Sequence, residues 1–334
     1  MADLQCHYLG LELKNPLVAS ASPFSKKISM AKKLEDKGVS AIVMYSLFQE
    51  QIEYESNQLD YFLNRGTDLS AEAITTYPDL KTYNMGVDAY LEQVKVLKEC
   101  LEIPVIASLN GYHSGDWVKN ALMLEQAGAD ALELNYYTVP TDVKRDSQSI
   151  EKELVDLVSS VCHQVHLPVS VKLSPYFTAL PNLAQRIIKA GADGLVLFNR
   201  FMQPDLDVET LEVEAFSRLS SSDELLLPLR WIALLYGKIH ADLALTTGVH
   251  SGLDMVKGIM AGADVVMVAS EFLANGADMA AVMVNDCNQW MDTYQYASVK
   301  EMKGTLSQEK VSAPQNYERA QYMKALIKYD HNLP

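Results

Sequence analysis

The chain is poor in the features that define several large classes of protein. Its 334 residues include 28 Lys and Arg against 43 Asp and Glu, which gives a formal net charge of −15. This balance argues against the broad basic surface with which proteins bind nucleic acids or anionic membranes. Local basic pockets, large enough for one phosphate group, remain compatible with the composition.

Long apolar runs are missing as well. No apolar stretch approaches the roughly 18 residues that a membrane-spanning helix needs. The N-terminal residues MADLQCHYLG lack the basic start and the apolar core of a signal peptide. We therefore expect a cytoplasmic protein without a membrane segment.

Cysteine is scarce and widely spaced, with four residues at Cys6, Cys100, Cys162 and Cys287. The absence of a Cys-x-x-Cys pair argues against an iron–sulfur cluster or a zinc site held within the chain, so we expect no metal. The four side chains are expected to be unpaired thiols in a reducing compartment.

The sequence is rich in short apolar runs of Val, Ile, Leu and Ala. Near-continuous apolar character without alternation is typical of parallel strands that are buried on both faces. Amphipathic helical stretches separate most of the runs, for example at 116–126, 150–165, 182–189 and 253–260. We predict eight strands at 16–20, 41–47, 104–110, 131–137, 168–174, 194–199, 241–248 and 265–270.

The tetrapeptide Ala-Gly-Ala-Asp occurs three times, at 127–130, 190–193 and 261–264, each time between a predicted helix and an apolar run. A glycine at this place suits a left-handed helix C-cap, and Gly38 resembles a fourth case. Eight strands alternating with helices favour a (β/α)8 barrel. An open sheet is less favoured, because no Gly-x-Gly-x-x-Gly motif follows the first strand.

We predict an α/β protein with one TIM barrel over residues 1–298. A helical C-terminal tail over 299–334 follows and is not a separate domain. Long polar insertions are expected after the second and the sixth strand, at 50–80 and 200–227. The loops at the carboxyl ends of barrel strands form the active site in such folds.

Polar residues close several of the apolar runs. Asn110, Asn135, Lys172 and Asn199 end strands that are otherwise apolar. A buried lysine needs a partner, because an unpaired buried cation is costly. Gly248-Val249 and Ala269-Ser270 follow the last two strands, where barrels commonly bind phosphate through backbone N–H groups; tight-turn packing is the alternative.

In these residues the chain resembles the dihydroorotate dehydrogenases. It looks like a divergent member of that family, similar to the class 1 enzymes. The resemblance covers about residues 8–275. It implies a bound FMN and hydride transfer from a CH–CH bond to flavin N5, nominally the oxidation of dihydroorotate to orotate in pyrimidine biosynthesis. The segments that carry it are Lys14-Asn15-Pro16-Leu17, Ala19-Ser20, Glu133-Leu134-Asn135, Val171-Lys172-Leu173-Ser174-Pro175-Tyr176, Asn199, Gly248-Val249, Gly252, Asp254 and Gly262-Ala263 with Ala269-Ser270.

The resemblance also implies individual roles. Lys172 would lie beside the N1–O2 edge of the flavin, where a fixed cation stabilises negative charge. Asn135 and Asn199 would contact the substrate, and Thr138 with Lys172 would be catalytic. The cofactor-binding residues would be Ala19, Ser20, Ser46, Asn110, Asn135, Lys172, Gly248, Val249, Ala269 and Ser270.

The chain departs from the family where the substrate would bind. Thr138 stands where the family has a cysteine or serine base, and a threonine hydroxyl could act only by relaying a proton. Tyr45 replaces a lysine, Pro140 replaces an asparagine, and 75–86 has no clear likeness to the family's substrate loop. FMN is therefore better supported than dihydroorotate.

Two other interpretations stay open. The first is a flavin-binding barrel without turnover of dihydroorotate, which would act as an electron-transfer partner or a regulatory subunit. The second is a flavin-free, phosphate-binding aldolase or isomerase in which Lys172 forms a Schiff base.

We expect a small-molecule substrate; an electron-acceptor protein and a homodimer are possible partners. Fumarate, NAD through a partner, a ferredoxin or a quinone are open as electron acceptors.

Overall fold

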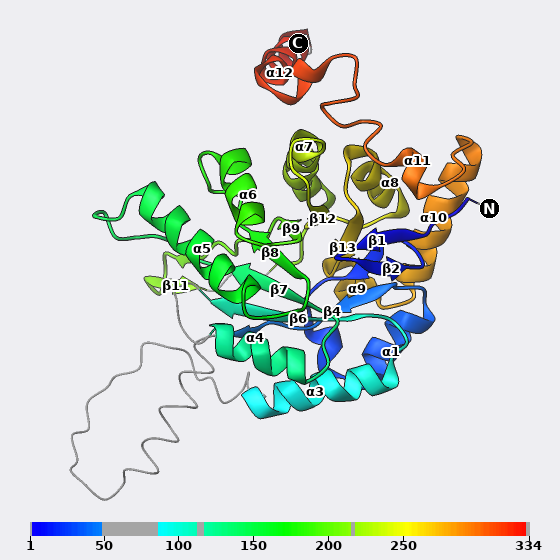
Figure 1. The fold of residues 1–334 in the computed structure, drawn as a ribbon. Coiled ribbons are helices and arrows are strands. Elements are labelled where there is room, and N and C mark those ends of the chain that lie inside the picture. The colour runs from blue at the N-terminus through cyan, green and yellow to red at the C-terminus, as the bar shows by residue number, and fades with distance from the viewer. Residues whose placement is uncertain (1, 49–85, 112–116, 215–217, 332–334) are drawn as a thin grey trace, which may run out of the picture.

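A closed barrel of parallel strands, surrounded by helices, forms the body of the protein (Figure 1). The computed structural model describes residues 2–48, 86–111, 117–214 and 218–331. The strand order is β4-β3-β13-β12-β9-β8-β7-β6, and β6 pairs with β4 to close the barrel. The predicted TIM barrel is confirmed.

The barrel strands match the eight predicted runs, although most are shorter. The run at 41–47 is interrupted after Val43, because the Tyr45 N–H donates to Ser25 Oγ at 2.7 Å instead of continuing the ladder. The chain then pairs with β6 again through β5 (Leu47–Phe48). The barrel strands are β3 (Leu17–Ala19), β4 (Ala41–Val43), β6 (Val105–Gly111), β7 (Ala131–Tyr136), β8 (Val169–Leu173), β9 (Gly194–Leu197), β12 (Asp242–Thr246) and β13 (Val265–Val268).

Helices follow most strands, and the four helical stretches named from the sequence are present. Helix α5 begins three residues before its predicted start, at Ser147, because the Asp146 carboxylate caps it by accepting the Ser149 N–H at 2.7 Å. The helices of the barrel are α1 (Ile28–Asp36), α3 (Val87–Cys100), α4 (Trp117–Gln126), α5 (Ser147–Cys162), α6 (Leu180–Lys189), α7 (Leu226–Leu235), α8 (Gly252–Ala261), α9 (Ser270–Asn275) and α10 (Met279–Thr293).

A hairpin of β1 (Cys6–Tyr8) and β2 (Leu11–Leu13) lies at the amino ends of the barrel strands. Its Tyr8 is fully buried and joins a cluster that includes Val18, Ile106 and Val196 from three barrel strands. The second and larger cluster holds side chains of the intervening strand positions together with those of the helices. The barrel interior is therefore apolar at its amino end, while alternate residues face the helices.

The three Ala-Gly-Ala-Asp repeats have one structural role. Gly128, Gly191 and Gly262 all have positive φ, as the predicted C-caps require. Each aspartate carboxylate then accepts the backbone N–H at or near the start of the preceding strand. The pairs are Asp130 with Val105 at 2.7 Å, Asp193 with Val169 at 2.8 Å and Asp264 with Leu243 at 2.9 Å. The repeats fix the amino ends of neighbouring strands relative to one another.

The insertions and the tail complete the chain. The predicted insertion at 50–80 lies outside the described residues. The connection at 200–227 carries an antiparallel ribbon, β10 (Asp205–Asp207) with β11 (Glu212–Glu214), and the 3-10 helix η3 (Ser222–Leu225). The 3-10 helix η1 (Pro23–Lys26) follows β3.

The tail starts on the barrel and ends away from it. Helix α11 (Val299–Met302) is followed by Gly304 and Leu306, whose N–H groups donate to α8 carbonyls at 2.9 and 2.8 Å. After η4 (Pro314–Tyr317), helix α12 (Arg319–His331) stands away from the barrel (Figure 1). The division of the chain at residue 298 stays a prediction.

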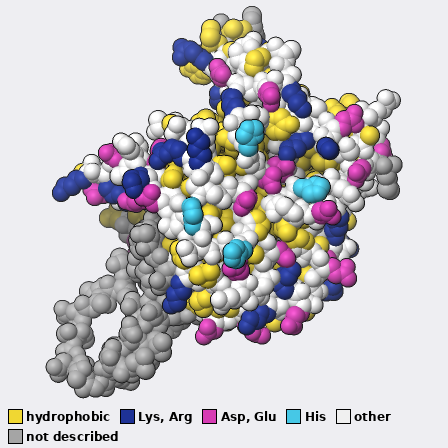
Figure 2. All heavy atoms as spheres, in the orientation of Figure 1, with side chains coloured by type: hydrophobic (Ala, Val, Ile, Leu, Met, Phe, Trp, Pro, Cys, Tyr) yellow, Lys and Arg dark blue, Asp and Glu magenta, His cyan; other side chains and the backbone are white. Residues whose placement is uncertain are grey.

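Charged side chains of both signs are interspersed over the face shown in Figure 2. Within the described ranges, no helix combines the length and the apolar character that crossing a bilayer requires.

The repeat glycines allow a matched test of packing. Alanine at Gly262 would place its Cβ 2.3 Å from the Tyr236 ring, whereas at Gly128 no described atom lies within 4 Å of the added Cβ. Both positions carry the left-handed backbone penalty of about 1–2 kcal/mol. We expect Gly262→Ala to lose a further ~1–3 kcal/mol of unfolding free energy through overpacking. Urea unfolding of both variants measures the difference, and equal losses would contradict the expectation.

Candidate active site

Three polar residues lie side by side because of the strand register. Asn110 of β6 is paired in register with Asn135 of β7, which is paired with Lys172 of β8. All three are buried and reach the carboxyl end of the barrel. Two residues earlier on β6 and β7, Ser108 pairs with Glu133, and side chains two residues apart on a strand point to the same face. These strands therefore carry a polar column inside the barrel.

Lys172 and Glu133 form a buried ion pair within this column. Lys172 Nζ lies 3.5 Å from Glu133 Oε1, and the two side chains are 8% and 0% exposed. Ser108 Oγ donates to the same carboxylate oxygen at 3.3 Å and lies 2.9 Å from Ser46 Oγ. Glu133 Oε2 is buried and has no hydrogen-bond partner among the described residues. Glu133 is thus the partner that a buried Lys172 requires.

Two adjoining cavities open above this row of residues. The first, of about 380 Å³, is lined by Ser46, Asn110, Asn135, Lys172 and Asn199 among others. The second, of about 420 Å³, shares Lys172 and Asn199 with the first. It extends to the residues that follow the last two barrel strands and β3, which are Ser20, Gly248, Val249, Ala269 and Ser270. Ala19 is buried at the end of β3 and is not among the residues that line either cavity.

The two substrate candidates contact each other. Asn199 Nδ2 donates to Asn135 Oδ1 at 2.6 Å. This bond leaves the Asn135 amide group as a donor and the Asn199 carbonyl as an acceptor, so the pair can offer both kinds of group to a ligand.

The loop after β12 is held in an unusual backbone conformation. Thr247 and Gly248 have φ values of +78° and +79°, and a β-branched residue rarely adopts this region. The Thr247 hydroxyl donates to the Phe198 carbonyl at 2.9 Å, which fixes the turn. A Cβ at Gly248 would lie 2.2 Å from the Leu225 backbone nitrogen, so only glycine fits there. Such retained strain is typical of ligand-binding loops.

Thr138 lies beside a different cavity. It lines a third space of about 720 Å³ with Val139, Phe201 and Met202, and it is not among the residues that line the two cavities next to Lys172. Tyr137 stacks on Phe201 at 4.2 Å between ring centroids, and Tyr137 also lines the 380 Å³ cavity. The role of Thr138 as a base stays a prediction.

A lysine from another element lies near Tyr45, the residue that replaces the family's lysine. Lys26 Nζ is 4.9 Å from the centroid of the Tyr45 ring, a cation–π distance. Partial burial lowers the pKa of Lys26. Tyr45 itself is buried and lines the 380 Å³ cavity.

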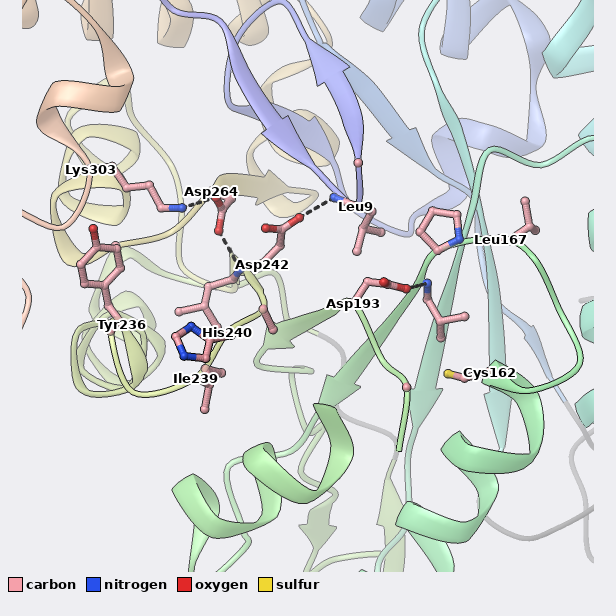
Figure 3. A pocket seen from close by; sticks show the side chains of 18 of the residues that line it. Leu9, Cys162, Leu167, Asp193, Tyr236, Ile239, His240, Asp242, Asp264 and Lys303 are labelled. Carbon is pink, nitrogen blue, oxygen red and sulfur yellow. Dashed lines mark hydrogen bonds and ion pairs between the residues drawn. The ribbon is translucent and has the colours of Figure 1, made fainter. Parts of the chain in front are cut away.

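Another cavity, of about 920 Å³, lies at the opposite, amino end of the barrel (Figure 3). Its aspartates already serve the fold, since Asp242 accepts the Leu9 N–H at 2.6 Å and Asp264 pairs with Lys303. Burial and the charge of Asp264 raise the pKa of Asp242. These contacts indicate that the aspartates hold the strand ends in place and do not bind a ligand.

The cysteines are free, as expected. Burial raises the pKa of Cys6 and of Cys162 to about 12 and that of Cys287 to about 11. These three thiols are therefore protonated and unreactive near neutral pH.

Sequence reasoning missed two sets of residues. The sequence analysis gives Glu133 no role beyond its motif, although a single carboxylate inside an apolar run indicates a buried partner. Ser220, His250 and Glu271 form a second hydrogen-bonded group beside the 420 Å³ cavity. No sequence signal joins Ser220 to a histidine thirty residues later.

The buried pair can be tested by a double-mutant cycle. Glu133→Gln or Lys172→Met alone leaves one buried charge without its partner, so we expect each to lose about 3–5 kcal/mol of unfolding free energy. The double variant buries no charge and should lose less than the sum. Lys14→Met, at an exposed lysine, is the control and should change stability by about 0.5 kcal/mol or less. Additive losses in urea unfolding would show that the two side chains do not interact.

Comparison with known proteins agrees with this geometry. A family model described as dihydroorotate dehydrogenase matches residues 3–291. A Thermoplasma acidophilum protein named dihydroorotate dehydrogenase B (NAD(+)), catalytic subunit, is 24% identical over 317 residues, 91% of this chain and 99% of the relative. A protein of the same name from Methanothermobacter thermautotrophicus is 26% identical over 309 residues, 90% of this chain and 97% of the relative.

A third relative differs in the acceptor that its name gives. This Aeropyrum pernix protein, with the provisional name dihydroorotate dehydrogenase A (fumarate), is 29% identical over 226 residues, 64% of this chain and 72% of the relative. With a family model matched along most of its length, a closed (β/α)8 barrel, and the polar row at the carboxyl ends of the strands, the chain is an oxidoreductase that belongs to the dihydroorotate dehydrogenase family.

Proposed function

We propose that the protein binds FMN and uses it to oxidise dihydroorotate to orotate. The observation that carries this proposal is the row of Asn110, Asn135 and Lys172, which the strand register places beside the 380 Å³ cavity. That cavity adjoins a second one, lined by Gly248 and Ser270. A site with a cation and amides at one end and loop backbone at the other suits a long ligand with an anionic end.

The residues present fit FMN. The ring end offers the Lys172 ammonium and the Asn135 amide as donors, and Lys172 is held in place by a fully buried carboxylate. The other end offers the backbone of two loops and the hydroxyls of Ser20, Ser220 and Ser270. Hydroxyl and N–H donors are the groups that bind a phosphate. When bound, FMN supplies the ring that accepts a hydride from the substrate.

The side chains would divide the remaining work. Lys172 provides a fixed positive charge that needs no reorganisation when negative charge develops beside it. Glu133, which Ser108 holds by a hydrogen bond, keeps the ammonium in one position and compensates part of its charge. Asn135 and Asn199, joined to each other, orient the substrate by presenting one donor group and one acceptor group.

The proton released by the substrate needs an acceptor. Thr138 holds the family position of the base, but a threonine hydroxyl would pass a proton on rather than keep it. The position of Thr138 beside the 720 Å³ cavity favours, as a second candidate, a flavin-binding barrel that passes electrons without fast turnover of dihydroorotate. Two of the relatives are named catalytic subunits, so we also propose an electron-acceptor partner protein.

The first test is the flavin itself. We expect the purified protein to be yellow, with one noncovalent FMN per chain, and dihydroorotate to bleach its absorbance under anaerobic conditions. Heat release followed by chromatography identifies the flavin. FMN that dihydroorotate does not bleach would favour the electron-transfer candidate. No flavin, even after incubation with excess FMN, would overturn the proposal.

The second test concerns the base. Thr138→Cys should raise the rate of flavin reduction by dihydroorotate, because a thiol with a pKa of about 8.5 ionises far more readily than a hydroxyl. Thr178→Cys places a thiol in the same 720 Å³ cavity and is the matched control. Stopped-flow bleaching between about pH 6 and 9 should show the gain increasing with pH for Thr138→Cys alone. The same rates in both variants would remove residue 138 from proton transfer.

A further inference from the structure

The ribbon of β10 and β11 presents apolar side chains to solvent. Leu206 is paired in register with Val213, and Val208 and Leu211 flank the turn that joins the two strands. These four side chains are between 67% and 89% exposed. A two-stranded hairpin is at best marginally stable in water on its own, so a ribbon of this kind needs a surface that covers its apolar side chains.

The same ribbon is strongly acidic. Residues 205–214 contain no basic residue and five acidic ones, which are Asp205, Asp207, Glu209, Glu212 and Glu214. The strand register sets Asp205 opposite Glu214 and Asp207 opposite Glu212, and like charges in such pairs destabilise a ribbon. Hydrogen bonds from the N–H groups of Thr210 and Glu209 lower the pKa of Asp207. A surface that covers the ribbon would therefore also have to bring positive charge.

Helix α12 has the opposite charge and a similar exposed apolar stripe. Tyr322, Met323, Leu326 and Ile327 lie on one side of the helix, since residues three and four apart are neighbours there. They are between 50% and 64% exposed. The helix carries one acidic residue against three basic ones, which are Arg319, Lys324 and Lys328. A 13-residue helix is marginal in water without packing, so this stripe needs a partner as well.

The ribbon and α12 are well separated within one chain. Arg230 of α7 holds the start of α12, because its guanidinium donates to the carbonyls of Tyr317 and Glu318 at 2.7 and 3.4 Å. Figure 1 shows α12 at the top of the view, beyond α7, and β11 at the left of the barrel. With a net charge of −15 on the whole chain, α12 is a basic element on an acidic protein. A second copy thus offers each of the two elements a surface of opposite charge.

We propose that α12 of one copy docks on the ribbon of a second copy. The apolar stripe would cover Leu206 and Val213, and the lysines of the helix would lie beside the carboxylates of β11. The dimensions agree, since the stripe from Tyr322 to Ile327 is about 8 Å long and strand β10 about 7 Å. Two copies that exchange helix for ribbon make this contact twice and form a closed dimer, in which neither element remains uncovered.

The docked helix would act on a segment that lines the candidate active site. Just before the ribbon, Gln203 and Pro204 line the 720 Å³ cavity. Just after it, Arg218 and Leu219 line the 420 Å³ cavity. A second copy bound to the ribbon therefore holds the connection after β9 from outside, next to both cavities.

An exchange of charges tests the contact. Lys324→Glu with Lys328→Glu reverses the charge of α12, and Glu212→Lys with Glu214→Lys reverses that of β11. Each double variant alone sets like charges against each other in both contacts, so we expect the dissociation constant of its dimer to rise at least about 100-fold. An equimolar mixture of the two variants has opposite charges in both contacts and should form dimers again. Sedimentation equilibrium compares the mass with the 37.1 kDa of one chain.

Lys119→Glu with Lys300→Glu, at exposed lysines of α4 and α11, changes the net charge equally and is the control that should stay dimeric. A wild-type chain that is a monomer at tens of micromolar would overturn the proposal. A dimer that both charge-reversed variants retain would overturn it too, because another surface would then join the copies. Variants that dissociate and stay monomeric when mixed would show that α12 and the ribbon do not meet. FMN takes no part in this measurement, so its outcome is independent of the proposed function.

Discussion

The register between neighbouring parallel strands is the constraint on which the site depends. Asn110, Asn135 and Lys172 are far apart in the chain, and they lie abreast because β6, β7 and β8 pair in one fixed alignment. A shift of one residue in any of these pairings would turn the polar side chains of that strand toward the surrounding helices. The same alignment places Glu133 on the inner face beneath them, where it meets Lys172.

The amino end of the barrel maintains that register. There the aspartates of the Ala-Gly-Ala-Asp repeats accept N–H groups at the starts of preceding strands, and Asp242 holds the hairpin that carries Tyr8. These contacts use side chains that would otherwise be available to ligands. The carboxyl end has the opposite character, because its amides, its lysine and its strained Thr247–Gly248 turn line cavities. Stability and ligand binding are thus separated along the barrel axis.

The buried Lys172–Glu133 pair lies beneath the cavities of the carboxyl end. A buried ion pair is weak evidence for stability, because the cost of removing two charges from water can exceed their attraction. Its value here is positional, since it fixes an ammonium at the base of the cavities. The departure at Tyr45 lies in the wall of the 380 Å³ cavity, and the departure at Thr138 lies beside the separate 720 Å³ cavity. Both leave the ion pair intact, which separates the part of the site that would hold the cofactor from the part that would select the substrate.

The barrel follows from the sequence, because alternating apolar runs and amphipathic helices with glycine C-caps leave few other folds. The sequence also indicates the family, through short segments such as Glu133-Leu134-Asn135 and Val171-Lys172, and the strand ends at which the polar residues lie. Which of these residues meet depends on how the chain folds. The Glu133–Lys172 pair depends on strand pairing, the interruption after Val43 depends on Ser25, and the joining of Ser220, His250 and Glu271 depends on three separate loops. These contacts link residues distant in sequence, and hydrophobic periodicity carries information only about neighbours along the chain.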